Sequence, residues 1–200
     1  MVKACRWRPD SRLLDSDAML IQRRPLLIGL GLTLVSSGCD GDRALNEPGA
    51  PAPAFELEDF QPESARFGES YGAEEFRGSV LLLPLFAAWC PNCVGSAVLL
   101  NKLHQEWMAD GLNVRIMSIN SIDGRSSRQK LIDACSFPLL QDTKEAKVWD
   151  KLLGSKDDHY VYTPEGVLDR YYDYGAGQRV DPLSPAGKAA LRDAIVAAGG

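Results

Sequence analysis

The stretch VLLLPLFAAWCPNC, residues 80–93, sets the interpretation of this 200-residue chain. Its first seven residues have the length and apolar character of a strand that is buried on both faces. Pro84 interrupts that run, and because proline donates no hydrogen bond to a neighbouring strand, we expect a bulge or a local edge there. Cys90 and Cys93 follow closely, and apolar residues then recur at helical spacing. The sequence therefore predicts a strand, a cysteine pair and a helix in succession.

The cysteine pair has the chemistry of a redox-active dithiol. Cys90 falls at the predicted N-terminus of the helix, where free N–H groups and the helix dipole stabilise a thiolate. Pro91 suits the first helical turn, because the donor that it lacks would have no partner there. Cys93 lies one turn further along, close enough to form a disulfide. We therefore predict that Cys90 attacks a substrate disulfide and that Cys93 resolves the mixed disulfide.

Other functions of a cysteine pair fit this sequence less well. A purely structural disulfide would close so short a loop that it would add little stability. A structural zinc site needs four ligands, usually two such pairs. Peroxiredoxins carry Pro-x-x-x-Thr-x-x-Cys, whereas Pro84 stands one residue too close to Cys90 and Ala87 replaces the threonine. Copper-delivering proteins with a comparable cysteine pair carry Cys-x-x-x-Cys, whose cysteines are one residue further apart than Cys90 and Cys93. We predict no metal ligand and no cofactor.

Strand and helix patterns alternate from Ala54 onwards. A half-buried strand (AFELEDF, 54–60) and a turn-rich segment precede the apolar strand. After the cysteine helix the pattern predicts a strand (112–120), a helix (127–135), a short strand (137–142), a helix (143–154), a hairpin (159–172) and a helix (184–198). Ser184 is a candidate cap of the last helix. The predicted fold class is α/β, a mixed β-sheet flanked by helices with an N-terminal β-hairpin extension.

This succession resembles the thioredoxin family. A strand, Trp-Cys-x-x-Cys and a helix, in that order, form the redox site of that family. The resemblance implies a thioredoxin-like domain at 54–200 with thiol-disulfide oxidoreductase activity. Residues 55–93 are similar to exported, membrane-tethered redoxins of the TlpA/ResA type. Residues 80–174 resemble the N-terminal domain of selenoprotein P, which has a comparable Ser-Ser-Arg loop, Val-Trp helix and Gly-Ser-Lys-Asp-Asp segment.

The family resemblances also bear on individual residues. Selenoprotein P carries selenocysteine at the position of Cys90, so the redox role carries over to Cys90 and Cys93. A selenium- or metal-binding carrier that uses the same thiols without turnover is the alternative function. Thioredoxins place a cis-proline opposite the cysteines, where this chain has Lys156 or Asp157. We expect Lys156 to face the Cys90 sulfur and to favour its thiolate, whereas Asp157 in that place would act the opposite way.

Several further side chains have a structural and a functional interpretation. We expect Trp89 to border the redox site and Cys135 to be a buried free thiol, with a third redox partner as its alternative role. His104 lies about 15 Å along the helix from Cys90 by helical rise, so we expect it to be solvated. His159 could approach the thiols. Asp157–Asp158 fits a solvated turn better than a proton relay.

Residues 1–38 have the layout of a secretory signal peptide. Arg23–Arg24 precede the ten-residue apolar run 26–35, which is too short to span a bilayer, and small residues then lead to Cys39. This arrangement resembles a bacterial lipoprotein signal and predicts lipidation of Cys39. A plain signal peptide and an uncleaved anchor stay open, and the arginine pair permits twin-arginine export. We predict that translation starts at Met19.

The composition of the chain indicates how the predicted domain is tethered and which kinds of partner it excludes. Residues 39–53 are rich in Gly, Pro and Asp and predict a flexible tether behind the lipidated cysteine. The net charge of −5 argues against nucleic acid as a partner, and five cysteines are too few for a disulfide scaffold. We therefore predict a monomer that is lipid-anchored in a bacterial cell envelope and faces the periplasm or exterior. Its expected partners are protein thiols and disulfides and an unidentified redox partner.

Overall fold

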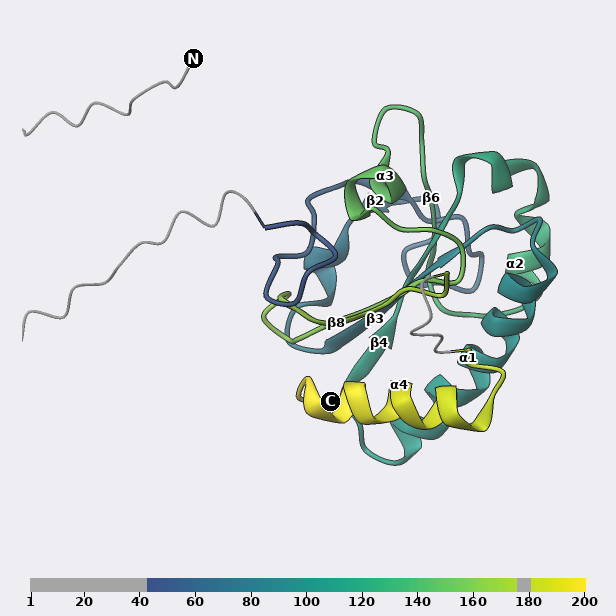
Figure 1. Ribbon diagram of the computed structural model, residues 1–200. Helices are drawn as coiled ribbons and strands as arrows, with labels where there is room; N and C mark the ends of the chain where they lie inside the picture. Colours follow the sequence, from purple (N-terminus) through teal and green to yellow (C-terminus); the bar gives the residue numbers. More distant parts are fainter. Residues whose placement is uncertain (1–42, 176–180) are drawn as a thin grey trace, which may run out of the picture. The chain divides into compact units, whose positions relative to one another are not determined.

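The computed structural model describes residues 43–175 and 181–200. The predicted signal peptide, the start at Met19 and the lipidation site Cys39 lie outside these residues. Within the described ranges, no helix has both the length and the apolar character that crossing a membrane would require. The described residues form a mixed sheet with helices on both faces (Figure 1), which is the predicted α/β fold class.

A central sheet organises the fold, and β3 (Val80–Phe86) runs through its middle with every residue buried. The strand order is β6–β5–β3–β7–β8, and β4 also pairs with β3. β3 is parallel to β4 and β5 and antiparallel to β7. The other strands are β4 (Val114–Ile116), β5 (Ser118–Asn120), β6 (Leu139–Gln141), β7 (His159–Tyr162) and β8 (Leu168–Tyr172). The predicted apolar strand is therefore the centre of the core.

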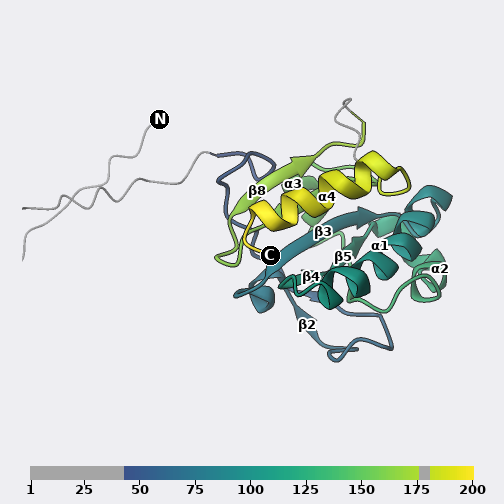
Figure 2. The same cartoon turned by 90° about the horizontal axis from the view of Figure 1, so that it is seen from below.

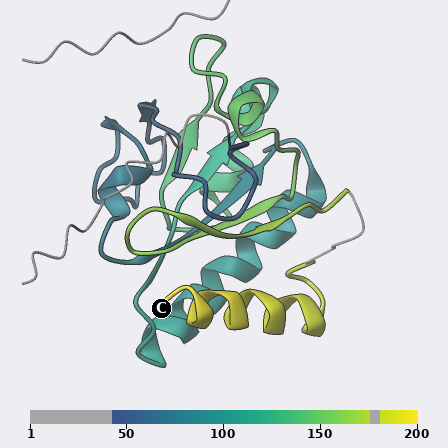
Figure 3. The same cartoon turned by 60° about the vertical axis from the view of Figure 1, so that its left-hand side comes forward.

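Helices cover both faces of this sheet. They are α1 (Pro91–Ala109), α2 (Gln129–Ile132), α3 (Val148–Leu152) and α4 (Pro185–Ala197). One core cluster joins the sheet to α1, α2 and α4, and a second cluster joins it to α3 and the N-terminal hairpin. Figures 2 and 3 show α4 beside α1, and an Arg192–Asp110 ion pair of 3.2 Å links the two. The cysteine helix therefore packs against the sheet beside α4.

Pro84 lies within β3 and pairs with His159 of β7 on one side. On the other side the partner strand is interrupted at Met117, between β4 and β5, although both hold the same register against β3. The Ser118 hydroxyl donates a hydrogen bond of 3.0 Å to the Pro84 carbonyl. Pro84 therefore lies beside the point where the neighbouring strand is interrupted. This break is a local edge of the sheet, where the N–H that proline lacks is not needed.

An N-terminal β-hairpin precedes β3, as the sequence predicts. β1 (Leu57–Glu58) pairs antiparallel with β2 (Ser70–Tyr71). The buried Asp59 carboxylate joins the hairpin to the sheet, because it accepts hydrogen bonds from the Tyr71 hydroxyl at 2.6 Å and from the Leu139 N–H at 3.3 Å. β1 is two residues long and therefore shorter than the strand predicted at 54–60.

The predicted tether, residues 39–53, ends earlier than expected. The Gly49 N–H donates to the Leu168 carbonyl at 2.7 Å, and the Leu168 N–H donates to the Ala50 carbonyl at 2.8 Å. The side chain of Ala50 is fully buried. These bonds satisfy backbone groups at the start of β8, so the folded unit begins before Gly49 rather than at Ala54.

Two predicted helices are shorter in the structure. The helix predicted at 143–154 is α3, bounded by Lys147 and Leu153 with φ of 48° and 54° in the left-handed region. The helix predicted at 127–135 is α2, preceded by a 3-10 helix (Ile122–Ser127). The last helix begins as predicted, because the Ser184 hydroxyl accepts a backbone N–H at 3.0 Å.

Candidate active site

Cys90 and Cys93 lie where β3 gives way to α1. β3 ends at Phe86, and a turn closed by the Cys90 N–H and the Ala87 carbonyl, 2.8 Å apart, leads to the helix. Cys90 is the N-cap residue of α1, with extended φ and ψ of −86° and 118°, and Pro91 is the first helical residue. Cys90 therefore stands at the helix N-terminus, where the N–H groups of the first turn are free, and its side chain makes no capping hydrogen bond.

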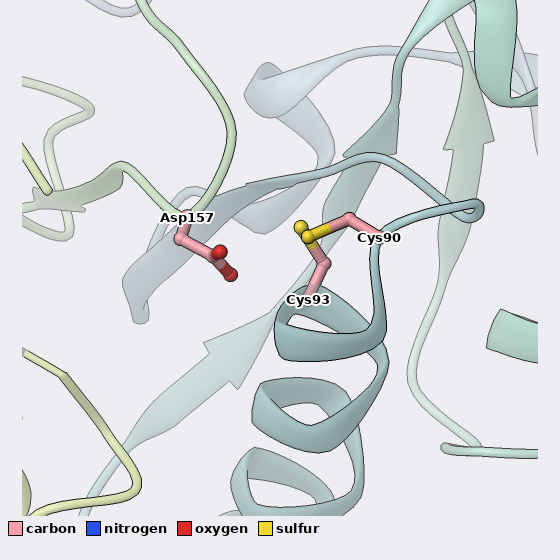
Figure 4. Close-up of side chains that lie close together, drawn as sticks. All are labelled: Cys90, Cys93 and Asp157. Atoms are coloured by element: carbon pink, nitrogen blue, oxygen red, sulfur yellow. The ribbon is translucent and has the colours of Figure 1, made fainter. Parts of the chain in front are cut away.

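Three polar side chains meet at this point (Figure 4). The sulfurs of Cys90 and Cys93 and one carboxylate oxygen of Asp157 all lie within 4.8 Å of one another. Both thiols are free, Cys93 is fully buried and Cys90 is 5% exposed. The third described thiol, Cys135, is buried as predicted, and burial raises its pKa. The arrangement is a close dithiol whose outer member is Cys90, and it can close to a disulfide with small movements.

A loop between α3 and β7 brings Asp157 to the cysteines. The Asp157 N–H donates to the Leu85 carbonyl at 2.8 Å, and the Leu85 N–H donates to the Asp158 carbonyl at 2.9 Å. Asp157 has a φ of 66°, a left-handed conformation that Asp tolerates better than most residues. This segment stands where thioredoxins are expected to have their cis-proline, although the peptide bonds of the described residues are all trans.

Burial favours the neutral forms of the two inner groups. It raises the pKa of Asp157, and a hydrogen bond of 3.1 Å from Asn92 Nδ2 to Asp157 Oδ2 partly opposes that rise. Burial also raises the pKa of the Cys93 thiol, and the negative charge of Asp157 adds to the effect. The inner thiol and the carboxyl group therefore both hold their protons more firmly than they would in water.

Lys156 lies outside this buried group. Its Nζ is 5.2 Å from the centre of the Trp89 ring, and Trp89 itself is 44% exposed. The structure therefore brings Asp157, rather than Lys156, to the sulfurs. The exposed Trp89 ring precedes Cys90 in the chain and carries the Lys156 ammonium over its face. A role of Trp89 at the border of the working site stays a prediction.

The Asp157–His159 segment is buried rather than the solvated turn that the sequence suggested. Asp158 is 1% exposed and accepts hydrogen bonds from the Ser155 N–H at 2.7 Å, the Tyr171 hydroxyl at 2.8 Å and the Tyr174 N–H at 2.9 Å. These three donors replace the water that the Asp158 carboxylate loses on burial, so both of its oxygens keep hydrogen-bond partners. Asp158 thereby holds the loop that carries Asp157.

Both histidines are more buried than a solvated position would allow. His159 is fully buried, with its ring edge-on to Phe86 at 6.4 Å between ring centres, and burial lowers its pKa to about 4. His104, predicted to be solvated, is partly buried, with Nε2 3.2 Å from the Val114 carbonyl oxygen, and burial lowers its pKa. Both rings therefore favour the neutral form.

Sequence reasoning missed two asparagines that shape the site. Asn92, inside the Cys-x-x-Cys motif, donates to Asp157. Asn120, the last residue of β5, accepts the Ala88 N–H at 3.0 Å and so fixes the loop that leads to Cys90. A polar residue at the end of a buried strand was the available signal for Asn120, but nothing local pointed to the partner of Asn92.

Comparison with curated proteins finds redox proteins among the relatives. Selenoprotein Pb of Danio rerio is 28% identical over 156 residues, which are 75% of this chain and 54% of that protein. The thiol-disulfide oxidoreductase ResA of Halalkalibacterium halodurans is 30% identical over 117 residues, 58% of this chain and 61% of ResA. DsbE of Vibrio cholerae, a thiol:disulfide interchange protein, is 32% identical over 92 residues, 46% of this chain and 45% of DsbE. The chain thus spans about half the length of these relatives.

Solved structures and a family model agree on the fold. A DsbE-type structure from Chlorobium tepidum has a TM-score of 0.58 at 19% identity and covers 77% of this chain and 99% of its own. A secreted Mycobacterium tuberculosis disulfide oxidoreductase has a TM-score of 0.51 at 17% identity, covering 68% and 95%. These likenesses show the predicted thioredoxin-like fold. The AhpC/TSA family model matches residues 48–170, more than half of the chain, and the protein therefore belongs to the AhpC/TSA family.

Proposed function

We propose that this protein is a thiol-disulfide oxidoreductase that acts through Cys90 and Cys93. The observation that carries the proposal is the close, free dithiol at the N-terminus of α1, whose outer sulfur is the more exposed. The names of the ResA and DsbE relatives support the same reaction class. All the groups that the reaction needs come from one chain, so we propose that the protein acts as a monomer.

The reaction proceeds in two exchanges that conserve atoms and electrons. The Cys90 thiolate attacks one sulfur of a substrate disulfide, so a mixed disulfide forms and one substrate thiolate leaves. Cys93 then loses its proton and attacks the Cys90 sulfur, which forms the Cys90–Cys93 disulfide and releases the second substrate thiolate. The substrate gains two electrons and, from solvent and protein, two protons. The reverse sequence oxidises a dithiol substrate.

Asp157 is the proposed proton acceptor in the second exchange. Its carboxylate is the acidic group that the fold holds against the buried Cys93 sulfur. Lys156 and Trp89 lie on the outer side, where they would contact the substrate chain rather than the inner thiol. Asp157→Asn should therefore slow release of the mixed disulfide about 10²-fold or more, while the first attack by Cys90 persists. Rapid-quench detection of the mixed disulfide separates the two steps.

Insulin disulfide reduction tests the oxidoreductase function directly. Cys90→Ser should abolish turnover, and Cys93→Ser should accumulate mixed disulfides that gel electrophoresis without reductant detects. Cys135→Ser should leave turnover unchanged, because that buried thiol donates to the Leu131 carbonyl at 3.5 Å and is not part of the group that Cys90, Cys93 and Asp157 form. Trapping by Cys90→Ser rather than Cys93→Ser would reverse the assigned roles. A wild-type protein that reduces no disulfide but retains bound selenium or metal would instead identify a carrier.

We further propose that the protein is exported and anchored in a bacterial cell envelope by lipid on Cys39. The support is the sequence alone: a basic pair, a ten-residue apolar run and small residues directly before that cysteine. Several acyl chains hold a protein to a membrane firmly, whereas one chain holds it weakly. Cys39→Ala should therefore move the protein from the membrane fraction to the soluble fraction. A wild-type protein that already fractionates as soluble would exclude the anchor.

A further inference from the structure

The three side chains that the proposed exchange uses also form a set of donor atoms for a cation. Two sulfurs and one carboxylate oxygen lie within 4.8 Å of one another, and all three side chains are at least 95% buried. Figure 4 shows the carboxylate directed toward the two sulfurs. Three donors that converge from two distant segments of the chain are the arrangement that a bound cation needs.

The Asp157 carboxylate is held in place through only one of its two oxygens. Oδ2 accepts the hydrogen bond from Asn92 Nδ2 at 3.1 Å, which fixes the plane of the carboxylate. Oδ1 is buried and has no hydrogen bond of ordinary geometry among the described residues. The Cys93 thiol stabilises the charged carboxylate, but a thiol is a weak donor, so this buried oxygen still lacks a strong donor or a cation. A ligand oriented by an outer hydrogen bond is a regular feature of metal sites.

The donor types select the class of cation. Thiolates favour soft and borderline ions, and Zn²⁺ accepts cysteine sulfur and carboxylate oxygen together. Donors around a tetrahedral zinc ion lie about 3.5–3.8 Å apart, given metal–ligand bonds of about 2.0–2.3 Å. A spread of 4.8 Å closes to that size with small side-chain rotations. Three protein ligands leave a fourth position open, on the side of the slightly exposed Cys90.

We propose that the reduced form of this protein binds one thiophilic divalent cation of the zinc class through Cys90, Cys93 and Asp157. Binding displaces the thiol protons into solvent and transfers no electrons. The same two sulfurs form the disulfide, so oxidation removes two of the three ligands and releases the ion. Binding and oxidation therefore exclude each other, and the cation protects the dithiol from oxidation and alkylation. The binding itself needs no catalytic turnover.

Cadmium titration of the reduced full-length protein tests this site, because cadmium–thiolate bonds give an ultraviolet charge-transfer band. We expect the band to saturate at one ion per chain, to be displaced by Zn²⁺, and to be absent from the disulfide form. Asp157→Asn should weaken cadmium binding more than tenfold. Asn92→Ala should weaken it about tenfold through the loss of the orienting hydrogen bond. The exposed Asp133→Asn, a matched change of charge, and Cys135→Ser should bind as wild type does.

Two results would overturn the proposal. One is cadmium binding of wild-type affinity in both Asp157→Asn and Asn92→Ala, since the thiols alone would then account for it. The other is the absence of a saturable band from the reduced wild type. Circular dichroism of each variant shows that a lost band does not reflect unfolding. Insulin reduction by the wild type in excess chelator is measured separately, so failure of the metal site and failure of the oxidoreductase function remain distinguishable.

Discussion

At the residue scale, the loop of Asp157 shows how one turn creates a buried site. Left-handed φ at Asp157 turns its carboxylate inward, while the neighbouring Asp158 takes its hydrogen bonds from the loop and from Tyr171. The two adjacent acidic residues therefore differ in role: Asp158 stabilises the loop, and Asp157 faces the two cysteine sulfurs. The sequence alone shows two equivalent aspartates, because only backbone conformation separates them.

His159 predicts a loss of stability in acid. Its pKa is lowered to about 4 by burial, from about 6.5 in an unfolded chain, so the folded state binds its proton less readily. The stability from the neutral ring is fully present above about pH 6.5 and is lost as pH falls toward 4. The free energy of unfolding should drop by up to about 3 kcal/mol over this window. Urea denaturation of chelator-treated protein at several pH values measures it.

His159→Gln is the variant that isolates this effect. It should flatten the fall in unfolding free energy between pH 6.5 and 4, although its absolute stability is lower because an amide replaces the packed ring. His104→Gln serves as the control, since that ring is only partly buried and should contribute a smaller part of the slope. An unchanged slope in His159→Gln would assign the acid sensitivity to other groups.

At the scale of elements, the strand, turn and helix around Cys90 follow from local rules. The apolar run gives β3, Pro91 starts α1 and Cys93 follows one turn later, so the dithiol could be predicted from the sequence. The partner loop could not. Asp157 reaches the thiols through backbone pairing with Leu85, and that contact depends on the packing of β7 against β3. Local propensity carries no information about it.

Two glycines in these elements should respond to alanine in opposite directions. A Cβ at Gly154, just before the Asp157 loop, would overlap Leu85 and the Tyr160 hydroxyl, both buried. Gly154→Ala should therefore cost about 1–3 kcal/mol of stability. A Cβ at Gly95 in α1 would make an ordinary contact with Leu183, so Gly95→Ala should add up to about 1 kcal/mol. Denaturation midpoints of both variants check the pair, and equal shifts would contradict the packing argument.

At the scale of the whole molecule, the α/β order and the N-terminal hairpin were predictable because alternating periodicity and turn residues record them. The boundary of the domain was not. Gly, Pro and Asp in residues 39–53 indicate flexibility, yet Gly49 and Ala50 pair with Leu168. The composition of a segment indicates whether it is flexible in isolation. It does not show that β8 offers hydrogen-bond partners to residues 49–50.

A chain shortened to begin at Ala54 should therefore be less stable than one that begins at Arg43. It loses the two hydrogen bonds between Gly49–Ala50 and Leu168, the bond of 2.9 Å from the Ala52 N–H to the Gly166 carbonyl, and the burial of the Ala50 side chain. Each such bond contributes about 0.5–1.5 kcal/mol, so we expect a loss of about 1.5–4.5 kcal/mol. Urea denaturation of the two proteins measures the difference. Equal stability would restore the predicted boundary at Ala54.

The contact at Leu168 also bears on how copies of the protein avoid one another. β8 is the last strand of the sheet, and an uncovered last strand is a template for strand addition and aggregation. Gly49 and Ala50 occupy backbone groups of Leu168, and Pro51 bridges to Val167 while offering no N–H of its own. Residues 49–51 thus cover the start of this edge strand, where they occupy backbone groups that a strand of another molecule would otherwise pair with.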